Sequence, residues 1–432
     1  MPDLLIRARL LSFTDEPSPD DPARVVYLED GGLVLRDGRI AGLGPFAELA
    51  AEARGAAVID HRPHLVMPGF IDPHIHFPQV QVIASYGAQL MDWLNAYTFV
   101  EEQRFADPAH AAAMAPAFFD ALIGHGTTTA AAFCSVHRAS AEAFFAEALR
   151  RNLRMIGGKV MMDRGAPEAL RDTPRSGYDD SKALIEAWHG RGRLHYAISP
   201  RFAITSSPAQ LEVAGALAAE HPGLHVQTHL AENRAECELA RSLFPDCRDY
   251  TDIYARHGLL GPRSVLGHCI HLSDRELGAI REHGAVAVFN PTSNLFLGSG
   301  LFDLGRLRRQ GVRVAVATDI GAGTSYSMLR TLDEAYKILQ LQGQTLAPLT
   351  SFYMATLGNA RALGLEGTIG QLVPGADADL VVLDARATEA MALRAARAES
   401  LGEELFILQT MGDDRAVRQT YIAGVPMKAA GA

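Results

Sequence analysis

The feature that most constrains the fold is a regular alternation of short apolar segments and helix-length segments through the middle of the chain. The apolar segments lie around residues 65–71 and at 127–133, 154–162, 194–200, 225–230, 264–270, 285–290 and 312–319. Between them lie amphipathic segments typical of helices, for example residues 207–221, 274–284 and 303–311. Eight strands that alternate with helices predict an α/β fold of the closed (β/α)₈ barrel type.

Both ends of the chain show a different pattern, in which short strand-like runs alternate with tight turns. In residues 1–65 we expect hairpin turns at Asp30-Gly31-Gly32 and at Asp37-Gly38. Residues 367–432 contain a buried-strand run at 380–383 and a hairpin pattern at 416–427. We therefore expect residues 1–65 and 367–432 to meet in one small β-sandwich beside a barrel of residues 66–366.

Composition narrows the class of protein. The chain has 432 residues, of which 48% are hydrophobic and 21% charged, and this is ordinary for a large globular protein. Its 40 basic and 50 acidic residues give a formal charge of −10 without a basic cluster, which argues against a nucleic-acid partner.

The sequence also indicates the cellular compartment of the protein. Charged residues interrupt the apolar N-terminal segment, and no apolar run approaches the roughly 18 residues of a membrane span, so we expect no membrane association. The four cysteines form no CxxC pair, which predicts reduced thiols in a cytoplasmic protein.

Polar side chains recur where the predicted strands end, and in a (β/α)₈ barrel this is where active sites form. They are His74 and His76 after the first strand, Arg201 after the fourth, His229 and Glu232 after the fifth, His268 after the sixth and Asp319 after the eighth. Each histidine alone could be a core residue, but together the histidines and the acid predict a metal site. Imidazole and carboxylate ligands suit both zinc and iron(II), so ligand type leaves the metal open.

The sequence lacks several other metal-binding and phosphate-binding motifs, and its other polar residues near the strand ends are interpreted as structural. The sequence has no HExxH motif, lacks the HxE and PCxxC pattern of the smaller zinc nucleobase deaminases, and its run 321–325 lacks the lysine of a phosphate-binding loop. Cys269 and His271 are interpreted as packing and loop residues. Lys159, on the third strand, is expected to be a buried or rim cation paired with an acid.

Several motifs together carry a family resemblance. The segments "PGFIDPHIH", "THLAE", "GHCIH", "ATD" and "GQLVPGADADLVVLD" resemble the amidohydrolase superfamily of metal-dependent hydrolases. More narrowly, "PGFIDPHIHFPQ", "YTFVEEQRF", "GKVMMDR", "SPRFAITSS", "QTHLAEN" and "NPTSNLFLGSG" resemble the guanine deaminase family, and the similarity extends over almost the whole chain.

The resemblance implies a distorted barrel, a β-sandwich built from both termini, and a homodimer. It also implies one zinc ion per chain, with iron(II) as the other possibility, held by His74, His76, His229 and Asp319. One metal is expected rather than two, because the end of the fourth strand, "YAISPRF", has no lysine that could be carboxylated. Glu232 and His268 would stand beside the metal's water, and Gln79, Arg201 and Phe202 would hold a purine together with His229, Glu232 and Asp319.

The implied reaction is the hydrolysis of guanine to xanthine and ammonia in purine catabolism. Bound zinc lowers the pKa of its water from about 15.7 to around 7. Asp319 would accept the released proton, His268 would steer the attacking oxygen, and Glu232 would protonate N3 of the ring and later the departing amine. Arg201 would donate to the purine O6, Gln79 would bind the ring edge, and Trp93 and Phe202 could enclose the ring plane.

Two alternatives remain at this point. One is a deaminase of another ring, such as an oxidised purine, a pterin or a triazine, which would use the same zinc and the same Glu232. The other is a non-catalytic scaffold, although relatives of that kind lose metal ligands and all four are present here.

Overall fold

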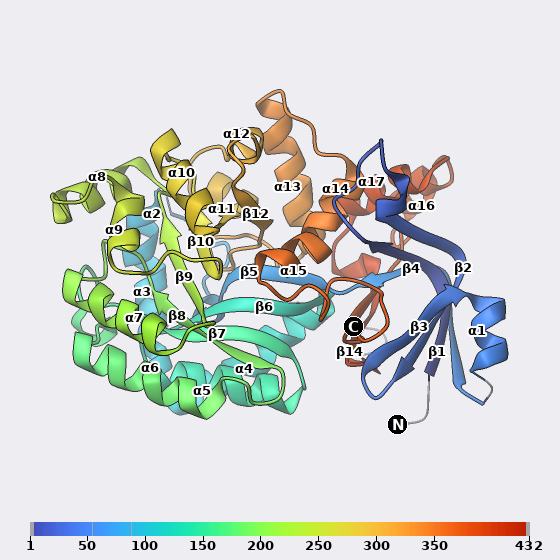
Figure 1. The fold of residues 1–432 in the computed structure, drawn as a ribbon, viewed down its shortest axis with the longest axis horizontal. Coiled ribbons are helices and arrows are strands. Elements are labelled where there is room, and N and C mark those ends of the chain that lie inside the picture. Colours follow the sequence, from blue (N-terminus) through green and yellow to red (C-terminus); the bar gives the residue numbers. More distant parts are fainter. Residues whose placement is uncertain (1–3, 54, 88, 429–432) are drawn as a thin grey trace.

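A computed structural model describes residues 4–53, 55–87 and 89–428, and its largest element is a parallel barrel beside a second sheet (Figure 1). Eight strands are hydrogen-bonded in sequence order, which confirms the predicted barrel. They are β5 (Phe70–His76), β6 (Thr127–Cys134), β7 (Arg154–Met161), β8 (Leu194–Pro200), β9 (His225–Leu230), β10 (Ser264–His268), β11 (Val286–Phe289) and β12 (Arg313–Val316). Because parallel strands share one direction, their carboxyl ends lie at one end of the barrel.

The barrel is closed between β12 and β5 by single hydrogen bonds instead of a continuous ladder. The Asn359 side chain donates to the carbonyls of Ile71 and Val316, at 2.7 and 2.8 Å, and accepts from the Val316 amide at 3.0 Å. Nearer the carboxyl end, the Asp319 amide donates to the His74 carbonyl at 3.0 Å. These contacts bring the ends of the first and last strands together.

Helices cover the outside of the barrel (Figure 1). The longer ones are α4 (Pro108–Gly124), α5 (Arg138–Arg150), α6 (Pro174–Trp188), α7 (Pro208–Glu220), α8 (Arg234–Leu243), α9 (Tyr250–Arg256), α10 (Asp274–His283) and α13 (Met328–Leu341). The shorter ones include α2 (Leu90–Trp93), α3 (Phe99–Gln103), α11 (Pro291–Phe296), α12 (Leu304–Arg309), α14 (Pro348–Tyr353) and α15 (Asn359–Ala362). The helices expected at 207–221, 274–284 and 303–311 are confirmed as α7, α10 and α12.

Local sequence explains where α10 begins and ends. The Ser273 and Glu276 side chains each accept from the other's backbone amide, which is a capping box, and Gly284 ends the helix in the left-handed conformation. Leu277 and Ile280 are buried. The sequence therefore specifies both the limits of this helix and the face that it packs against the barrel.

The second sheet is built from both ends of the chain, as expected, in the strand order β15-β14-β13-β4-β1-β2-β3. The N-terminal strands are β1 (Leu4–Phe13), β2 (Val25–Arg36), β3 (Arg39–Pro45) and β4 (Ala57–Pro68), and the C-terminal strands are β13 (Leu380–Leu383), β14 (Val417–Ile422) and β15 (Val425–Pro426). Strand β4 joins the two halves, since it pairs parallel with β1 and antiparallel with β13. Helix α1 (Phe46–Glu52) lies on the N-terminal strands, and α16 (Glu389–Ala395) and α17 (Leu401–Met411) come between β13 and β14.

One of the two expected N-terminal turns is wrong. Asp37 and Gly38, both with positive φ, form the hairpin turn between β2 and β3, but Asp30-Gly31-Gly32 lies inside β2. A Cβ at Gly31 would lie 2.6 Å from Leu10 Cδ1 on the neighbouring strand. Gly31 is therefore explained by the close approach of a neighbouring side chain, and not by a turn.

Two further observations concern the described residues as a whole. No helix among them is long and apolar enough to cross a membrane. All four cysteines are free thiols, two of them buried.

Candidate active site

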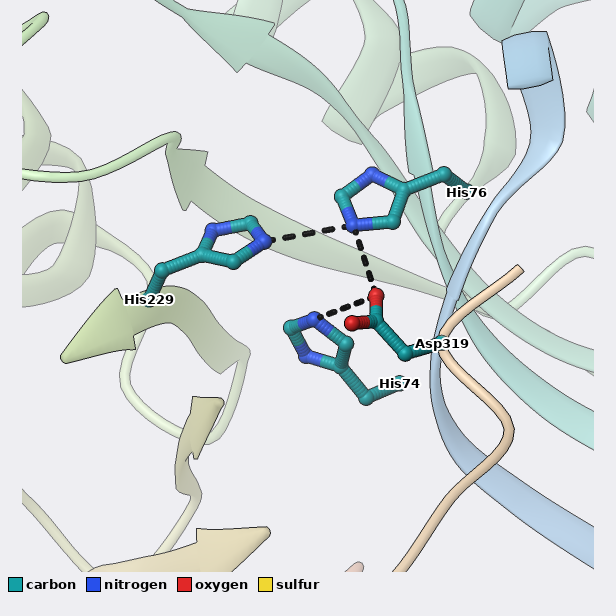
Figure 2. A group of neighbouring side chains, drawn as sticks. All are labelled: His74, His76, His229 and Asp319. Atoms are coloured by element: carbon teal, nitrogen blue, oxygen red, sulfur yellow. Dashed lines mark hydrogen bonds and ion pairs between the residues drawn. The ribbon is translucent and has the colours of Figure 1, made fainter. Parts of the chain in front are cut away.

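Four side chains from three strand ends converge at the carboxyl end of the barrel (Figure 2). His74 and His76 come from the end of β5, His229 from β9 and Asp319 from the segment that follows β12. Each offers one ligand atom, and these atoms all lie within 4.8 Å of one another. All four residues are buried, so a cation among them would be held away from bulk water.

The separations within this group suit a single metal ion. Asp319 Oδ1 lies 3.3 Å from His74 Nε2 and 3.2 Å from His76 Nε2, and His76 Nε2 lies 3.2 Å from His229 Nε2. Zinc takes nitrogen and oxygen ligands at about 2.0–2.1 Å, and a tetrahedral arrangement then places neighbouring ligand atoms about 3.3–3.4 Å apart. These three of the six separations are therefore close to those between the ligands of one such ion.

The hydrogen-bond partners of these histidines also fit a bound metal ion better than a network of hydrogen bonds among the four side chains. The imidazole of His229 donates from Nδ1 to the Arg201 carbonyl at 2.7 Å, so the lone pair on its Nε2 faces His76 Nε2. Both nitrogens of His74 and Nδ1 of His76 are buried without a hydrogen-bond partner in the described part of the chain. Buried polar atoms are rarely left unpaired, and a metal ion would satisfy the lone pairs that face one another here.

The protonation states favour metal binding as well. Burial lowers the pKa of His76 to about 4 and the pKa of His229 well below its usual value, so both rings are neutral near pH 7. Burial acts to raise the pKa of Asp319, but the adjacent His74 and His76 outweigh it and hold that pKa well below the usual range. Neutral imidazoles and an ionised carboxylate are the ligand forms that divalent metals bind.

Residues around the group set its geometry. Asp72, two residues before His74, accepts from the His74 amide at 3.4 Å and from the backbone amide and hydroxyl of Thr318, next to Asp319. At Gly267 a Cβ would lie 2.5 Å from His74 Cε1, so only glycine leaves room for this ring. Asp72 therefore holds the His74 backbone beside Thr318, and Gly267 leaves the space that the His74 ring occupies.

Glu232 and His268 lie beside the metal-ligand group. His268 Nε2 is 3.4 Å from Glu232 Oε2 and 3.7 Å from Asp319 Oδ2. Its Nδ1 is 2.9 Å from Asn294 Oδ1, an acceptor, so Nδ1 carries a proton and Nε2 is the ring nitrogen that faces Glu232 and Asp319. Asn294 thereby determines which nitrogen of His268 faces the site.

Glu232 is in an environment that favours its protonated form. It is buried, and its Oε1 accepts a hydrogen bond from Ser299 Oγ at 2.8 Å. Burial and the negative charge of Asp319 raise the pKa of Glu232 to about 8. A carboxylic acid with such a pKa can donate a proton at neutral pH and take it back later in a reaction cycle.

A cavity that opens to solvent lies against these groups, and its empty space is about 350 Å³ with the solvent at its mouth included. Its polar wall consists of His76, Gln79, Arg201, His229, Glu232, His268, Ser293 and Asp319, and its apolar wall of Leu90, Trp93, Leu94, Phe202, Leu297 and Ala322. The structure thus brings the sequence-predicted residues to one cavity, Trp93 included; His74 alone lies behind its wall. A small planar ring with polar edges matches such a lining.

Arg201 is buried instead of forming a surface salt bridge. Its Nη1 donates to Glu102 Oε1 at 3.0 Å and to Oε2 at 2.7 Å, and the Gln79 amide donates to the same Oε1 at 2.8 Å. Sequence reasoning assigned no role to Glu102, Asn294 or Ser299. Glu102 lies on the short helix α3, Asn294 on α11 and Ser299 in a loop. Neither hydrophobic periodicity nor the end of a strand marks these positions in the sequence.

The residues expected to lie outside the site do so. Lys159 is buried and pairs with Asp172 at 2.6 Å, which confirms its interpretation as a buried cation. Cys269 is buried, and His271 Nε2 contacts the Ser299 carbonyl at 2.8 Å. These residues support the loops of the site without facing the cavity.

Backbone strain is concentrated at the same strand ends. His268, Cys269 and Asp319 have φ of 71°, 54° and 55°, in the left-handed region that non-glycine residues rarely adopt. Such conformations cost of order 1–3 kcal/mol each and persist only where the surrounding structure enforces them. Here they turn the two functional side chains toward the cavity.

A parallel barrel with imidazole and carboxylate donors at its strand ends defines the class of metal-dependent hydrolases. The model of the amidohydrolase family matches residues 65–427, and the chain belongs to this family. A guanine deaminase of Escherichia coli K12 is 46% identical over 409 residues, which cover 94% of this chain and 93% of that protein.

Solved structures show the same likeness. A guanine deaminase from C. acetobutylicum, with guanine bound in its active site, superposes with a TM-score of 0.88 at 27% identity and covers 98% of this chain and 100% of its own. An adenosine deaminase from Xanthomonas campestris with bound zinc superposes with a TM-score of 0.81 at 25% identity, covering 98% and 92%.

Proposed function

We propose that this enzyme hydrolyses guanine to xanthine and ammonia, with one zinc ion per chain. The observation that carries the proposal is one cavity that combines a metal-ligand group, the buried carboxyl group of Glu232 with its raised pKa, and side chains suited to a purine edge. The E. coli relative is a guanine deaminase, and the C. acetobutylicum structure holds guanine.

His74, His76, His229 and Asp319 would hold the metal. Zinc is favoured by the spacing of the nitrogen and oxygen donors, and it is the metal named for the X. campestris neighbour. When bound there, the ion supplies a water acidic enough to act as a nucleophile near neutral pH. The absence of a lysine at the end of β8 favours one ion over two.

The protein groups then manage the protons. Asp319 is ionised and accepts the proton that the water loses, while His268 accepts a hydrogen bond at Nε2 and orients the attacking oxygen toward C2 of guanine. Glu232, protonated near neutral pH, gives its proton to N3 as the bond to C2 forms. When the C2–N bond breaks, the amine leaves as ammonia and takes the proton first accepted by Asp319, delivered through Glu232. The proton of the new C2 hydroxyl then passes through Asp319 to Glu232 as the C2 carbonyl forms, so that both carboxyl groups return to their starting states.

Recognition of the purine is assigned to side chains that line the cavity. Arg201 would donate to O6, Gln79 would meet the ring edge, and Trp93 and Phe202 would cover the ring faces. His229, Glu232 and Asp319 would contact the reacting edge of the substrate. A polar site of this kind discriminates strongly, because an analogue without the matching atoms leaves buried groups unpaired.

We also propose a cytoplasmic homodimer that acts in purine catabolism. The free cysteines are in keeping with a reducing compartment. The homodimer and the metabolic role rest on the resemblance to guanine deaminases.

The test is ammonia release from guanine, adenine, cytosine and 8-oxoguanine by metal-replete protein, with xanthine identified as the product from guanine. We expect guanine to have the highest kcat/KM; a higher value for any other ring would overturn the substrate assignment. Metal analysis should find about one zinc per chain. Less than about half an equivalent of zinc or iron in active protein would overturn the metal assignment.

A further inference from the structure

One buried carboxylate holds both side chains that are assigned to the purine edge. Glu102, on α3, accepts from Gln79 Nε2 at 2.8 Å and from Arg201 Nη1 at 2.7 and 3.0 Å. It is 1% exposed, so these two side chains are its partners instead of water. Hydrogen bonds of this charge-assisted kind are shorter and stronger than neutral ones.

Glu102 is itself held firmly. Its carbonyl accepts from Ser135 Oγ at 2.9 Å, at the end of β6, and the Arg201 guanidinium lies 5.5 Å from the ring centre of Phe99 on the same helix. The segment is thus attached to the barrel on one side and to Arg201 on the other. A carboxylate fixed in this way can set the orientation of its partners.

The contacts determine what remains available to a ligand. Gln79 Oε1 accepts from the Gly321 amide at 3.0 Å, so the amide of Gln79 has only one orientation that satisfies both neighbours. Arg201 uses Nη1 for Glu102, and its Nε and Nη2 make no hydrogen bond to the described part of the chain. Both side chains therefore keep N–H groups to offer, and the Arg201 charge is balanced by Glu102.

We propose that Glu102 is the positioning residue that makes this pocket specific for purines with an oxygen at C6. It turns N–H donors of Arg201 and Gln79 toward the cavity, where an oxygen acceptor fits and an amino group or a bare C–H does not. It also balances the charge of Arg201, so this part of the wall suits a neutral ring. The inference rests on the proposed function, because it deepens the recognition step assigned to Arg201 and Gln79.

A purely structural role for the pair is the competing explanation. Burying an ion pair costs desolvation energy, and well-packed apolar residues often stabilise a fold as much or more. Arg201 and Gln79 line the cavity, and Glu102 lies directly behind them, bonded to both. Its location is therefore better explained by ligand recognition than by stability.

The test compares binding of two unreactive rings, hypoxanthine with its C6 oxygen and purine without it. Neither has an amine at C2, so binding can be measured by calorimetry on zinc-replete protein without turnover. In the native protein hypoxanthine should bind more tightly. In Glu102→Gln this preference should fall by about 10- to 150-fold, the value of one charged hydrogen bond, while the affinity for purine and the zinc content stay within about threefold.

Glu101→Gln is the matched control. Glu101 precedes Glu102 on α3, but its carboxylate pairs with Arg104 at 2.8 Å and with His110, away from Gln79 and Arg201. This variant should keep the native preference. If Glu102→Gln does not fold, Glu102→Asp retains the charge but withdraws the oxygens, and it should shift the preference in the same direction by a smaller factor.

Each outcome decides the proposal. A preference that is unchanged, or equal weakening of both rings, would overturn it and leave Glu102 a structural residue. Loss of zinc in Glu102→Gln would overturn it as well, because the variant would then act through the metal site. If native protein released no ammonia from guanine, the proposed function would fail, whereas the comparison of hypoxanthine with purine would still decide the role of Glu102.

Discussion

The two ends of the barrel are both rich in buried polar groups, but they use them differently. At the carboxyl end, both nitrogens of His74 and one of His76 have no hydrogen-bond partner in the described part of the chain, and Glu232 and Asp319 lie close enough to affect each other's charge. Several strand ends there have left-handed backbone. The unpaired nitrogens at this end are atoms that a bound metal ion would satisfy.

At the amino end the charges satisfy one another. Arg154, the first residue of β7, donates to Asp377 at 2.6 and 2.9 Å, and Arg193, just before β8, donates to Asp377 at 2.9 Å and to Asp379 at 2.8 Å. The remaining oxygen of Asp379 accepts from the Ala423 amide at 2.7 Å. These pairs connect the barrel to the C-terminal part of the second sheet.

Charged groups are buried at the two ends of the barrel for two different reasons. Groups that are paired within the protein hold elements together, whereas groups aimed at one point without partners await a ligand. Substitutions at the carboxyl end should therefore change metal content and catalysis with little effect on stability. Substitutions at the amino end should lower stability and leave metal content and catalysis unchanged.

The largest effect is expected for His74→Ala. Removal of one of four ligands should lower zinc content and guanine deamination together, toward background, because the metal's binding and its activated water depend on the same ligands. Metal analysis and ammonia release on the same preparation check this. His225→Gln is the control at the amino end, where His225 Nε2 contacts the Leu363 carbonyl at 2.8 Å, and it should retain zinc. Full zinc and full activity in His74→Ala would remove this histidine from the site.

Glu232→Gln should show the second largest effect and separate proton transfer from metal binding. Glutamine keeps the shape and can still contact Ser299, but it can neither give nor take a proton on the catalytic timescale. General acid–base groups contribute about 10²–10⁴ in rate, and one group serves both N3 and the amine, so the loss should be near the upper limit. Single-turnover rates, zinc content and guanine affinity measure it. A drop below about tenfold would mean that another group moves the proton, and loss of zinc would make Glu232 a ligand.

Asp377→Ala tests the amino end. It leaves Arg154 without its carboxylate partner and should lower the free energy of unfolding by roughly 3 kcal/mol, with zinc content and kcat unchanged. Burial acts to raise the pKa of Asp377, but Arg154 and Arg193 outweigh it and hold that pKa below its ordinary value. Its contribution is therefore present above the unfolded pKa of about 3.9 and is lost as pH falls through the folded value. Denaturant unfolding at pH 7 and near pH 3 should show the difference from native protein shrinking in acid; a difference that persists there would contradict this origin.

Most of the architecture could be predicted because it follows from periodic patterns. Eight apolar runs gave the barrel strands, and the polar residues that follow them, such as His229 and Asp319, lie at the carboxyl end for geometrical reasons. The error at Asp30-Gly31-Gly32 has the opposite cause, since a glycine required by packing has the same letter as one required by a turn. Local sequence signals therefore predict strands and turns correctly only where one physical cause dominates.

The supporting residues could not be predicted in this way. Glu102 is 99 residues from Arg201, and Arg154 is 223 residues from Asp377, so nothing local links the partners. Asn294 and Ser299 act on His268 and Glu232 through side-chain orientation, which depends on how helix and loop pack over the strand ends. Such pairings exist only once the chain has folded.

The smallest effect is expected for Arg201→Lys at the carboxyl end, and Arg193→Lys makes the same change at the amino end. Arg201→Lys keeps the positive charge beside Glu102, so the fold should lose little stability. Lysine lacks the planar fork, however, and cannot hold Glu102 while presenting further N–H groups to the C6 oxygen. Loss of one hydrogen bond from a charged group corresponds to about 10-fold or somewhat more in kcat/KM for guanine. Arg193→Lys, the same change at the amino end, should leave kcat/KM unaltered, because that guanidinium meets only protein groups. Steady-state kinetics on both variants decide the point: equal kcat/KM values would mean that Arg201, like Arg193, serves only to bind its carboxylate.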